Sequence, residues 1–215
     1  EDLLEDVKLI EGERIAGIVV PKICGAEDIR EFAKLLEECE RREGLKDGSL
    51  KLLPLIENAQ AVMNVQEIAG CSGRIIALLF GGEDYLDSVW GKHTDPPRAF
   101  DVPRAMIVMA ARMHDILPID TPYLDLKNRE GFMKEEGEAC CLGFAGALLV
   151  NPVQIPWANE CFQPSCEEMR QAQKVLDAVE GMRAAGESIA MLDGRMIGPT
   201  MIKRARKVLE LKRKL

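Results

Sequence analysis

Five short segments, each almost continuously apolar, alternate along the chain with longer segments of helical period. The apolar segments are residues 16–23, 51–58, 74–82, 116–123 and 146–152. Strands without a polar face are buried on both sides, which is typical of a parallel sheet covered by crossover helices. The pattern predicts an α/β fold, and both a doubly wound sheet and a (β/α)₈ barrel fit it.

Helices are predicted between and after these strands, at residues 26–44, 59–70, 101–115, 128–142, 165–184 and 199–215. No G-x-G-x-x-G sequence follows the first strand, and no Walker A sequence occurs. The chain therefore lacks the phosphate cradle that the nucleotide-binding versions of such folds have.

The amino-acid composition excludes some classes of binding partner. A net charge of -8 argues against a nucleic-acid surface. The basic stretch 203–215 reads as the solvated face of an amphipathic helix, with a patch for an anionic cofactor as the alternative.

Seven cysteines without a C-x-x-C pair indicate a reducing compartment, and two histidines without zinc-ligand spacing disfavour zinc. No apolar run reaches the ~20 residues of a membrane span, and the initial Glu1 indicates a removed N-terminal piece or a fragment.

Polar residues follow each predicted strand at its carboxyl end, where the sites of both candidate architectures lie. In chain order they are Lys22, Glu57, residues 81–84, Asp120 and Asn151. We expect them to converge on one rim of the sheet, which makes the chain a candidate enzyme.

Glu57 and Asp84 are the predicted metal ligands. Carboxylates at adjacent strand ends, without a nearby His or Cys, suit Mg²⁺ or Mn²⁺. A metal held in this way can polarise a carbonyl and stabilise an enolate. The alternative is that both acids only cap the helices that follow.

For each of the other strand-end residues, two interpretations stay open. The Gly81-Gly82 pair forms either an anion-binding nest of backbone amides or only a tight turn, and Glu83 is either solvated or orients this loop. Asp120 is either a supporting acid or a helix N-cap. Lys22 either contacts a phosphate or carboxylate or is plain surface charge.

Six motifs in order give the chain a specific resemblance: VVPKI, LLPLIENAQAV, IALLFGGEDY, IDTPYLD, LGFAGALLVNPVQI and FQPSCEE. They resemble the citrate lyase beta-subunit-like CoA-ester lyases of the HpcH/HpaI aldolase family. The resemblance implies a (β/α)₈ TIM barrel of the phosphoenolpyruvate/pyruvate type, here without its first three strands. It implies one partial barrel domain over residues 1–215, with 185–215 as a C-terminal loop and helix.

The resemblance also implies an activity: a Mg²⁺-dependent carbon–carbon lyase, with Mn²⁺ as the alternative metal. Its substrate would be a short 3-hydroxyacyl-CoA such as citramalyl-, malyl-, methylmalyl- or citryl-CoA, cleaved through a metal-stabilised enolate to an acyl-CoA ester and a short 2-keto acid. Glu57 and Asp84 would bind the metal. Gly82, Glu83 and Asp84, together with Lys22, would bind substrate. Asp120 and Pro122 would support the site or face the CoA, and no catalytic residue is assigned.

The expected assembly is a homo-oligomer, such as a trimer, and the expected compartment is the cytoplasm, with the mitochondrial matrix as the alternative. Ala147 and Asn151 stand where the family often has Lys and His. Gly198 stands where many relatives have an Asp, for which Asp193 is a weak substitute. These departures leave two other interpretations open: an aldolase acting on a free 2-keto acid without CoA, and a truncated, non-catalytic barrel that serves as a binding subunit.

Overall fold

The computed structural model describes residues 15–184, 186 and 188–213. Contacts within the chain divide it into two compact units, residues 1–161 and 162–215. Each unit is described by itself. A single partial barrel domain over the whole chain stays a prediction.

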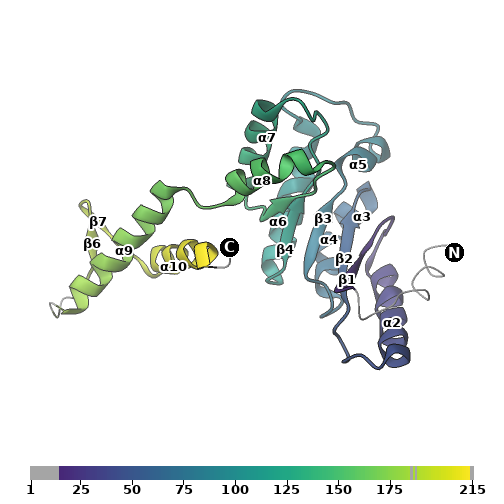
Figure 1. Ribbon diagram of the computed structural model, residues 1–215, viewed down its shortest axis with the longest axis horizontal. Helices are drawn as coiled ribbons and strands as arrows, with labels where there is room; N and C mark the ends of the chain where they lie inside the picture. Colours follow the sequence, from purple (N-terminus) through teal and green to yellow (C-terminus); the bar gives the residue numbers. More distant parts are fainter. Residues whose placement is uncertain (1–14, 185, 187, 214–215) are drawn as a thin grey trace. The chain divides into compact units, whose positions relative to one another are not determined.

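The first unit is built on a five-stranded parallel sheet in sequential order (Figure 1). Its strands are β1 (Gly17–Val20), β2 (Lys51–Ile56), β3 (Ala77–Phe80), β4 (Leu117–Asp120) and β5 (Gly146–Ala147). All four neighbouring pairs are parallel. The predicted α/β fold with a parallel sheet is confirmed, and among the described residues the sheet does not close into a barrel.

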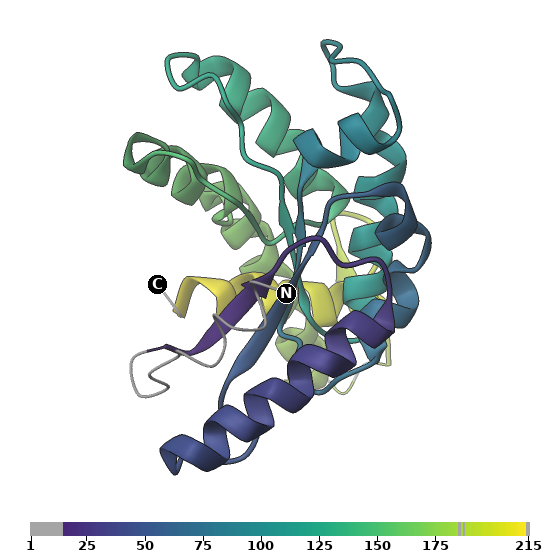
Figure 2. The same cartoon turned by 90° about the vertical axis from the view of Figure 1, so that its right-hand side faces the viewer.

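Helices connect the strands and form an arc around the sheet (Figure 2). They are α2 (Ala26–Glu43), α3 (Ala59–Met63), α4 (Val65–Gly70), α5 (Gly82–Ser88), α6 (Asp101–Met113), α7 (Arg129–Leu142) and α8 (Ile155–Phe162), with the 3₁₀ turns η2 (Arg98–Phe100) and η3 (Pro152–Gln154). This alternation of strand and helix brings the carboxyl ends of all five strands to one rim.

The two faces of the sheet differ in burial. Leu52, Ile56 and Phe80 are fully buried. On the opposite face Val19 in β1 and Leu117 in β4 are 49% and 50% exposed. The expectation that every strand is buried on both faces therefore holds for β3, whose four residues are all buried, and fails for its neighbours. A barrel buries its inner face only when the sheet closes.

Several element boundaries differ from the predicted ones. The helix expected over residues 59–70 is two helices, because Asn64 caps the end of α3 and donates a side-chain hydrogen bond to the Cys24 carbonyl oxygen at 2.9 Å. Gly82, expected at the end of a strand, begins α5. The strand expected over residues 146–152 is only Gly146–Ala147, and α8 follows in a segment where no helix was expected.

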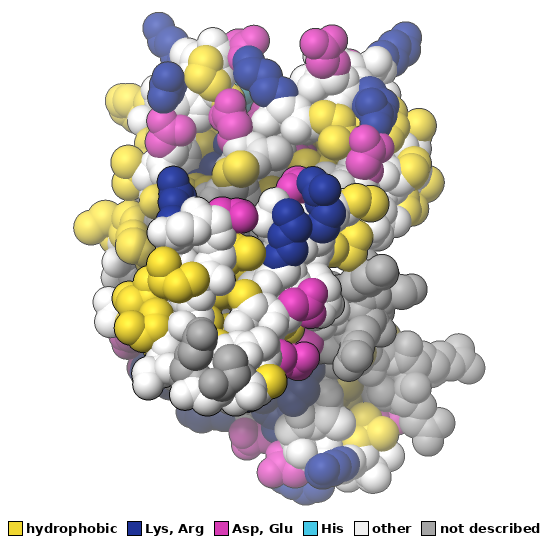
Figure 3. Space-filling view, turned by 90° about the vertical axis from the view of Figure 1, so that its left-hand side faces the viewer, with side chains coloured by type: hydrophobic (Ala, Val, Ile, Leu, Met, Phe, Trp, Pro, Cys, Tyr) yellow, Lys and Arg dark blue, Asp and Glu magenta, His cyan; other side chains and the backbone are white. Residues whose placement is uncertain are grey.

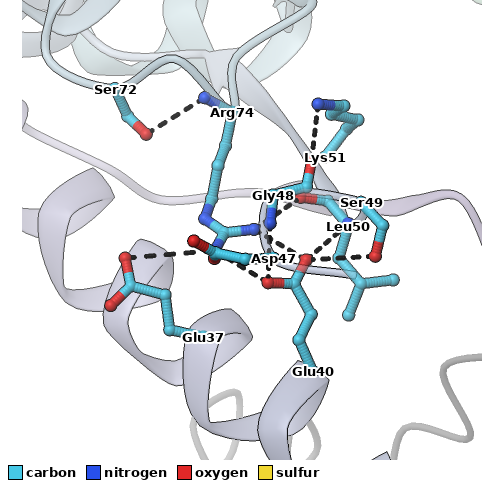
Figure 4. Close-up of polar contacts among 9 residues, drawn as sticks. All are labelled: Glu37, Glu40, Asp47, Gly48, Ser49, Leu50, Lys51, Ser72 and Arg74. Carbon is cyan, nitrogen blue, oxygen red and sulfur yellow. Dashed lines mark hydrogen bonds and ion pairs between the residues drawn. The ribbon is translucent and has the colours of Figure 1, made fainter. Parts of the chain in front are cut away.

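A buried ion pair fastens α2 to the amino end of the sheet (Figure 4). The terminal guanidinium nitrogens Nη1 and Nη2 of Arg74 each donate a 2.8 Å hydrogen bond to one carboxylate oxygen of Glu40. The same carboxylate accepts hydrogen bonds from the backbone amides of Leu50 at 2.7 Å and Gly48 at 3.0 Å. Glu40 in α2 and Arg74 just before β3, with exposed fractions of 2% and 7%, thus form a buried ion pair that also holds the loop between α2 and β2.

The second unit is a helical pair with a small hairpin. Helices α9 (Cys166–Ala184) and α10 (Pro199–Arg213) flank the antiparallel strands β6 (Met191–Leu192) and β7 (Arg195–Met196). Its core consists of Ala172, Val175, Val179, Ala190, Ile197 and Ala205. Figure 3 shows hydrophobic side chains gathered on the surface of this unit. Among the described residues, no helix has both the length and the apolar character needed to cross a membrane.

Candidate metal and substrate site

The carboxyl ends of the first three strands bring Lys22, Glu57 and Asp84 together. Lys22 follows β1, Glu57 follows β2 directly, and Asp84 lies in the first turn of α5 just after β3. The Lys22 ammonium nitrogen lies 2.5 Å from Asp84 Oδ1 and 3.7 Å from Glu57 Oε1. The two predicted metal ligands thus approach one common cation position.

The two carboxylates sit in different surroundings. The Glu57 side chain is 3% exposed, whereas that of Asp84 is 56% exposed. One ligand is therefore fixed in the protein interior, and the other faces solvent at the mouth of the site. This arrangement leaves one side of the cation position open to a small molecule.

Lys22 contacts Glu57 through its backbone as well as its side chain. Its φ of 58° lies in the left-handed region, which is uncommon for a residue with a side chain. In this conformation the Lys22 N–H donates a hydrogen bond of 2.6 Å to Glu57 Oε1. The hydrogen bond to Asp84 raises the pKa of the Lys22 amine, burial opposes this rise, and the charge of Glu57 adds to it.

The two glycines after β3 let the backbone lie close to the Glu57 side chain and to Thr121 after the next strand. A Cβ on Gly81 would lie 3.1 Å from Glu57 Oε2 and closer still to Glu57 Cβ. The Gly82 N–H donates a 2.9 Å hydrogen bond to Thr121 Oγ1, and a Cβ on Gly82 would also collide with Phe100. The Gly82 amide thus has a protein partner, and a cradle for substrate from the amides of residues 82–84 stays a prediction.

The side chain of Glu83 contacts His93 in the loop that follows α5. Its Oε2 atom lies 3.1 Å from Nε2 of His93, and both side chains are exposed. The structure thus places Glu83 against the segment between α5 and η2. A contribution to substrate binding stays a prediction.

Asp120 at the end of β4 is fully buried and paired with an arginine of α6. The terminal nitrogen Nη2 of Arg104 lies 2.9 Å from Asp120 Oδ2 and 2.7 Å from Glu135 Oε1. Burial raises the pKa of Asp120, and Arg104 opposes this rise. Its burial fits a supporting acid better than a direct contact with CoA. Pro122, two residues further on, is half-buried.

Two titratable residues of this cluster, Arg104 and Glu136, were not singled out from the sequence. Arg104 is the one charged residue between Val102 and Ala111 of α6, and that isolation is the only hint of a buried partner. Glu136 on α7 is fully buried, and neither of its carboxyl oxygens has a hydrogen-bond partner. Burial raises the pKa of Glu136 to about 9, and the charges of Asp120 and Glu135 add to the rise. Glu136 is therefore neutral near pH 7.

Residues that depart from the family pattern have structural roles or lie in the second unit. The Asn151 side chain accepts a hydrogen bond from the Val153 N–H and caps η3, and Gln154 bonds back to the Asn151 N–H. Asp193 has a left-handed φ of 50° in the turn between β6 and β7, and Gly198 lies just before α10, within residues 162–215.

The donor set suits a divalent metal held by two protein ligands. Within residues 15–184, 186 and 188–213, no group of three or more His, Cys, Asp or Glu side chains could hold a metal ion. Mg²⁺ usually takes one or two carboxylates and keeps its other positions for water and substrate oxygens. The Lys22 ammonium already lies between Glu57 and Asp84, which indicates that a cation fits there. Both Glu57 and Asp84 could therefore hold the metal.

Comparison with known proteins identifies relatives over nearly the whole chain. Residues 2–152 match the family described as HpcH/HpaI aldolase/citrate lyase. The citrate lyase subunit beta of Haemophilus influenzae is 32% identical over 191 residues, covering 89% of this chain and 66% of that protein. The L-malyl-CoA/beta-methylmalyl-CoA lyase of Cereibacter sphaeroides (strain ATCC 17025) is 31% identical over 223 residues, covering 95% of this chain and 68% of that protein. The chain thus spans about two thirds of the length of these relatives.

Solved structures share the fold. Protein CitE of Mycobacterium tuberculosis, in complex with magnesium, acetoacetate and coenzyme A, matches with a TM-score of 0.70 at 22% identity, covering 91% of this chain and 68% of that one. A citrate lyase from Burkholderia xenovorans LB400 matches with a TM-score of 0.80 at 20% identity, covering 93% and 64%. At these identities the structures support the fold, while the sequence matches show the family. The predicted resemblance is confirmed: the chain belongs to the HpcH/HpaI aldolase/citrate lyase family.

Proposed function

We propose that this chain carries the metal site of a Mg²⁺-dependent carbon–carbon lyase that acts on a short 3-hydroxyacyl-CoA. The observation that supports this most strongly is the approach of Glu57 and Asp84, from adjacent strand ends, to one cation position. Relatives named citrate lyase subunit beta and malyl-CoA lyase support the class of reaction. A solved relative in complex with magnesium, acetoacetate and coenzyme A supports the class of ligand.

Each residue at the site has a defined task in this proposal. Glu57 and Asp84 hold the metal, which when bound supplies a Lewis acid for the oxygens of a 2-keto or 2-hydroxy acid. Gly81 leaves room for the Glu57 side chain, and Thr121 fixes the start of α5 through Gly82. The buried Asp120, paired with Arg104, anchors the end of the neighbouring strand.

The reaction breaks the bond between the hydroxyl-bearing carbon and the α-carbon of the acyl-CoA. The hydroxyl proton leaves, a keto group forms, and the electron pair of the broken bond remains with the α-carbon, which then takes up a proton. The lyase test is to incubate the full protein and Mg²⁺ with citramalyl-, malyl-, methylmalyl- and citryl-CoA. Mass spectrometry would follow the acyl-CoA product, and a coupled assay would follow pyruvate, glyoxylate or oxaloacetate.

We expect cleavage of at least one ester, and its loss in Glu57→Gln and Asp84→Asn. Asp87→Asn, an exposed acid later in α5, is the matched control and should retain activity. Aldol reaction of a free 2-keto acid without CoA, with no cleavage of any ester, would replace this proposal with a CoA-independent aldolase. Binding without cleavage of any ester would favour a non-catalytic binding subunit. Homo-oligomer formation and the cytoplasmic or mitochondrial compartment stay predictions.

A further inference from the structure

Lys22 occupies the position that the proposed metal would take. Its ammonium nitrogen lies 2.5 Å from Asp84 Oδ1 and 3.7 Å from Glu57 Oε1. Two carboxylates this close repel each other unless a positive charge lies between them. In the structure that charge is the ammonium group of Lys22.

The backbone holds Lys22 at this place independently of its side chain. The left-handed φ of 58° and the 2.6 Å hydrogen bond from the Lys22 N–H to Glu57 fix its Cα beside the site. The side chain itself is 64% exposed. Lys22 can therefore swing its ammonium group off the carboxylates into solvent without disturbing the backbone contact with Glu57.

The charge balance at the rim changes when a divalent cation arrives. Glu57 and Asp84 together carry two negative charges, which Mg²⁺ neutralises in full. Lys22 then adds one uncompensated positive charge at the rim, beside a metal that retains open positions. A small carboxylate would meet both the metal and a free ammonium group there.

We propose that Lys22 is an internal counter-ion that competes with the divalent metal for Glu57 and Asp84, and that the metal releases it to bind the carboxylate of the incoming substrate. This inference rests on the proposed function, because it requires the metal to sit between these two acids. Metal binding would then precede anion binding. Lys22 would act as a positioning residue without the metal and as a substrate-binding residue with it.

The test measures two affinities in the full protein by isothermal titration calorimetry: Mg²⁺ alone, and pyruvate at saturating Mg²⁺. In Lys22→Met we expect Mg²⁺ to bind about 10-fold more tightly, because a unit charge a few ångströms from the metal is removed. Pyruvate should bind about 10-fold more weakly. A fold defect would weaken both affinities, so opposite shifts distinguish the proposed role from a structural one.

Lys46→Met is the matched control, because it removes the same charge from an exposed position at the other end of β2. The six residues of β2 separate the two sites by about 20 Å, so screening should leave both affinities unchanged. Unchanged or weaker Mg²⁺ binding in Lys22→Met would overturn the inference, as would unchanged pyruvate binding. If Lys22→Met gives one of these results but Glu57→Gln still abolishes Mg²⁺ binding, the proposed metal site stands. No Mg²⁺ binding by either the wild type or Lys22→Met would refute both.

Discussion

The buried pair of Glu40 and Arg74 predicts a specific dependence of stability on pH. Burial alone raises the pKa of Glu40, but hydrogen bonds from Arg74 and from the amides of Leu50 and Gly48 outweigh it. Together they lower this pKa from 4.5 to about 2. The folded state therefore holds the carboxylate charged at pH values where the unfolded chain binds a proton.

The difference between these pKa values corresponds to about 3 kcal/mol of free energy of unfolding. Because the pKa is lowered on folding, this contribution is complete above about pH 4.5. It is lost progressively as the pH falls from about 4.5 to about 2. In Glu40→Gln this dependence should disappear, and the variant should be less stable than wild type by about 3 kcal/mol at pH 7, because Arg74 stays buried without its carboxylate.

Urea denaturation followed by far-UV circular dichroism at a series of pH values measures both effects. The matched control is Glu160→Gln, which removes an exposed partner of Arg129 in the same compact unit. An exposed pair contributes at most about 1 kcal/mol, so this variant should keep the wild-type pH profile. The reasoning is refuted if Glu40→Gln is no less stable than Glu160→Gln, or if its stability still falls with the wild-type slope below pH 4.5.

Two other changes test the surroundings of the site. Glu136→Gln should stabilise the protein by about 3 kcal/mol at pH 7, because the wild type must keep this acid neutral up to about pH 9 while the unfolded chain ionises near 4.5. The wild type should therefore lose stability as the pH rises from about 4.5 to 9. Urea denaturation measures the free energy of unfolding of Glu136→Gln, with the exposed Glu138→Gln as control. Equal free energies of unfolding in the two variants would contradict the prediction. Gly81→Ala should weaken Mg²⁺ binding in calorimetry by about 10-fold, the order found when groups that orient a metal ligand are changed, because its Cβ displaces Glu57. Gly73→Ala, whose Cβ meets open space, should bind like wild type, and equal affinities in both variants would exclude this steric role.

The sheet could be predicted from the sequence because its strands carry a strong hydrophobic signal. Continuous apolar runs located β2 and β4, although these strands end at Ile56 and Asp120, two and three residues before the predicted ends at residues 58 and 123. The length of Gly146–Ala147, the shortest strand of the five-stranded sheet, was overestimated, because the apolar residues after it lie in irregular backbone. The β6–β7 hairpin was missed although Asp193 and Gly194, with φ of 50° and 75°, form a turn dipeptide that favours such hairpins.

The site could be predicted only in part, for a physical reason. Parallel strands bring their carboxyl ends to one rim, so the nearness of Glu57 and Asp84 follows from topology. The position of Lys22 depends on a left-handed backbone conformation that a lysine does not signal, because Gly, Asn and Asp are the residues enriched in it. The pairing of Arg104 with Asp120 depends on the packing of α6 against β4, which residue spacing does not reveal.

The central claim is that Glu57 and Asp84 bind one divalent metal ion. Anomalous diffraction from crystals of the full protein soaked in Mn²⁺, a good substitute for Mg²⁺ at oxygen sites, tests it most directly. The account predicts one anomalous peak with a carboxylate oxygen of each residue at about 2.1 Å, and a Lys22 side chain displaced from both. A peak bound to other residues, or no peak between these two carboxylates at saturating Mn²⁺, would contradict it.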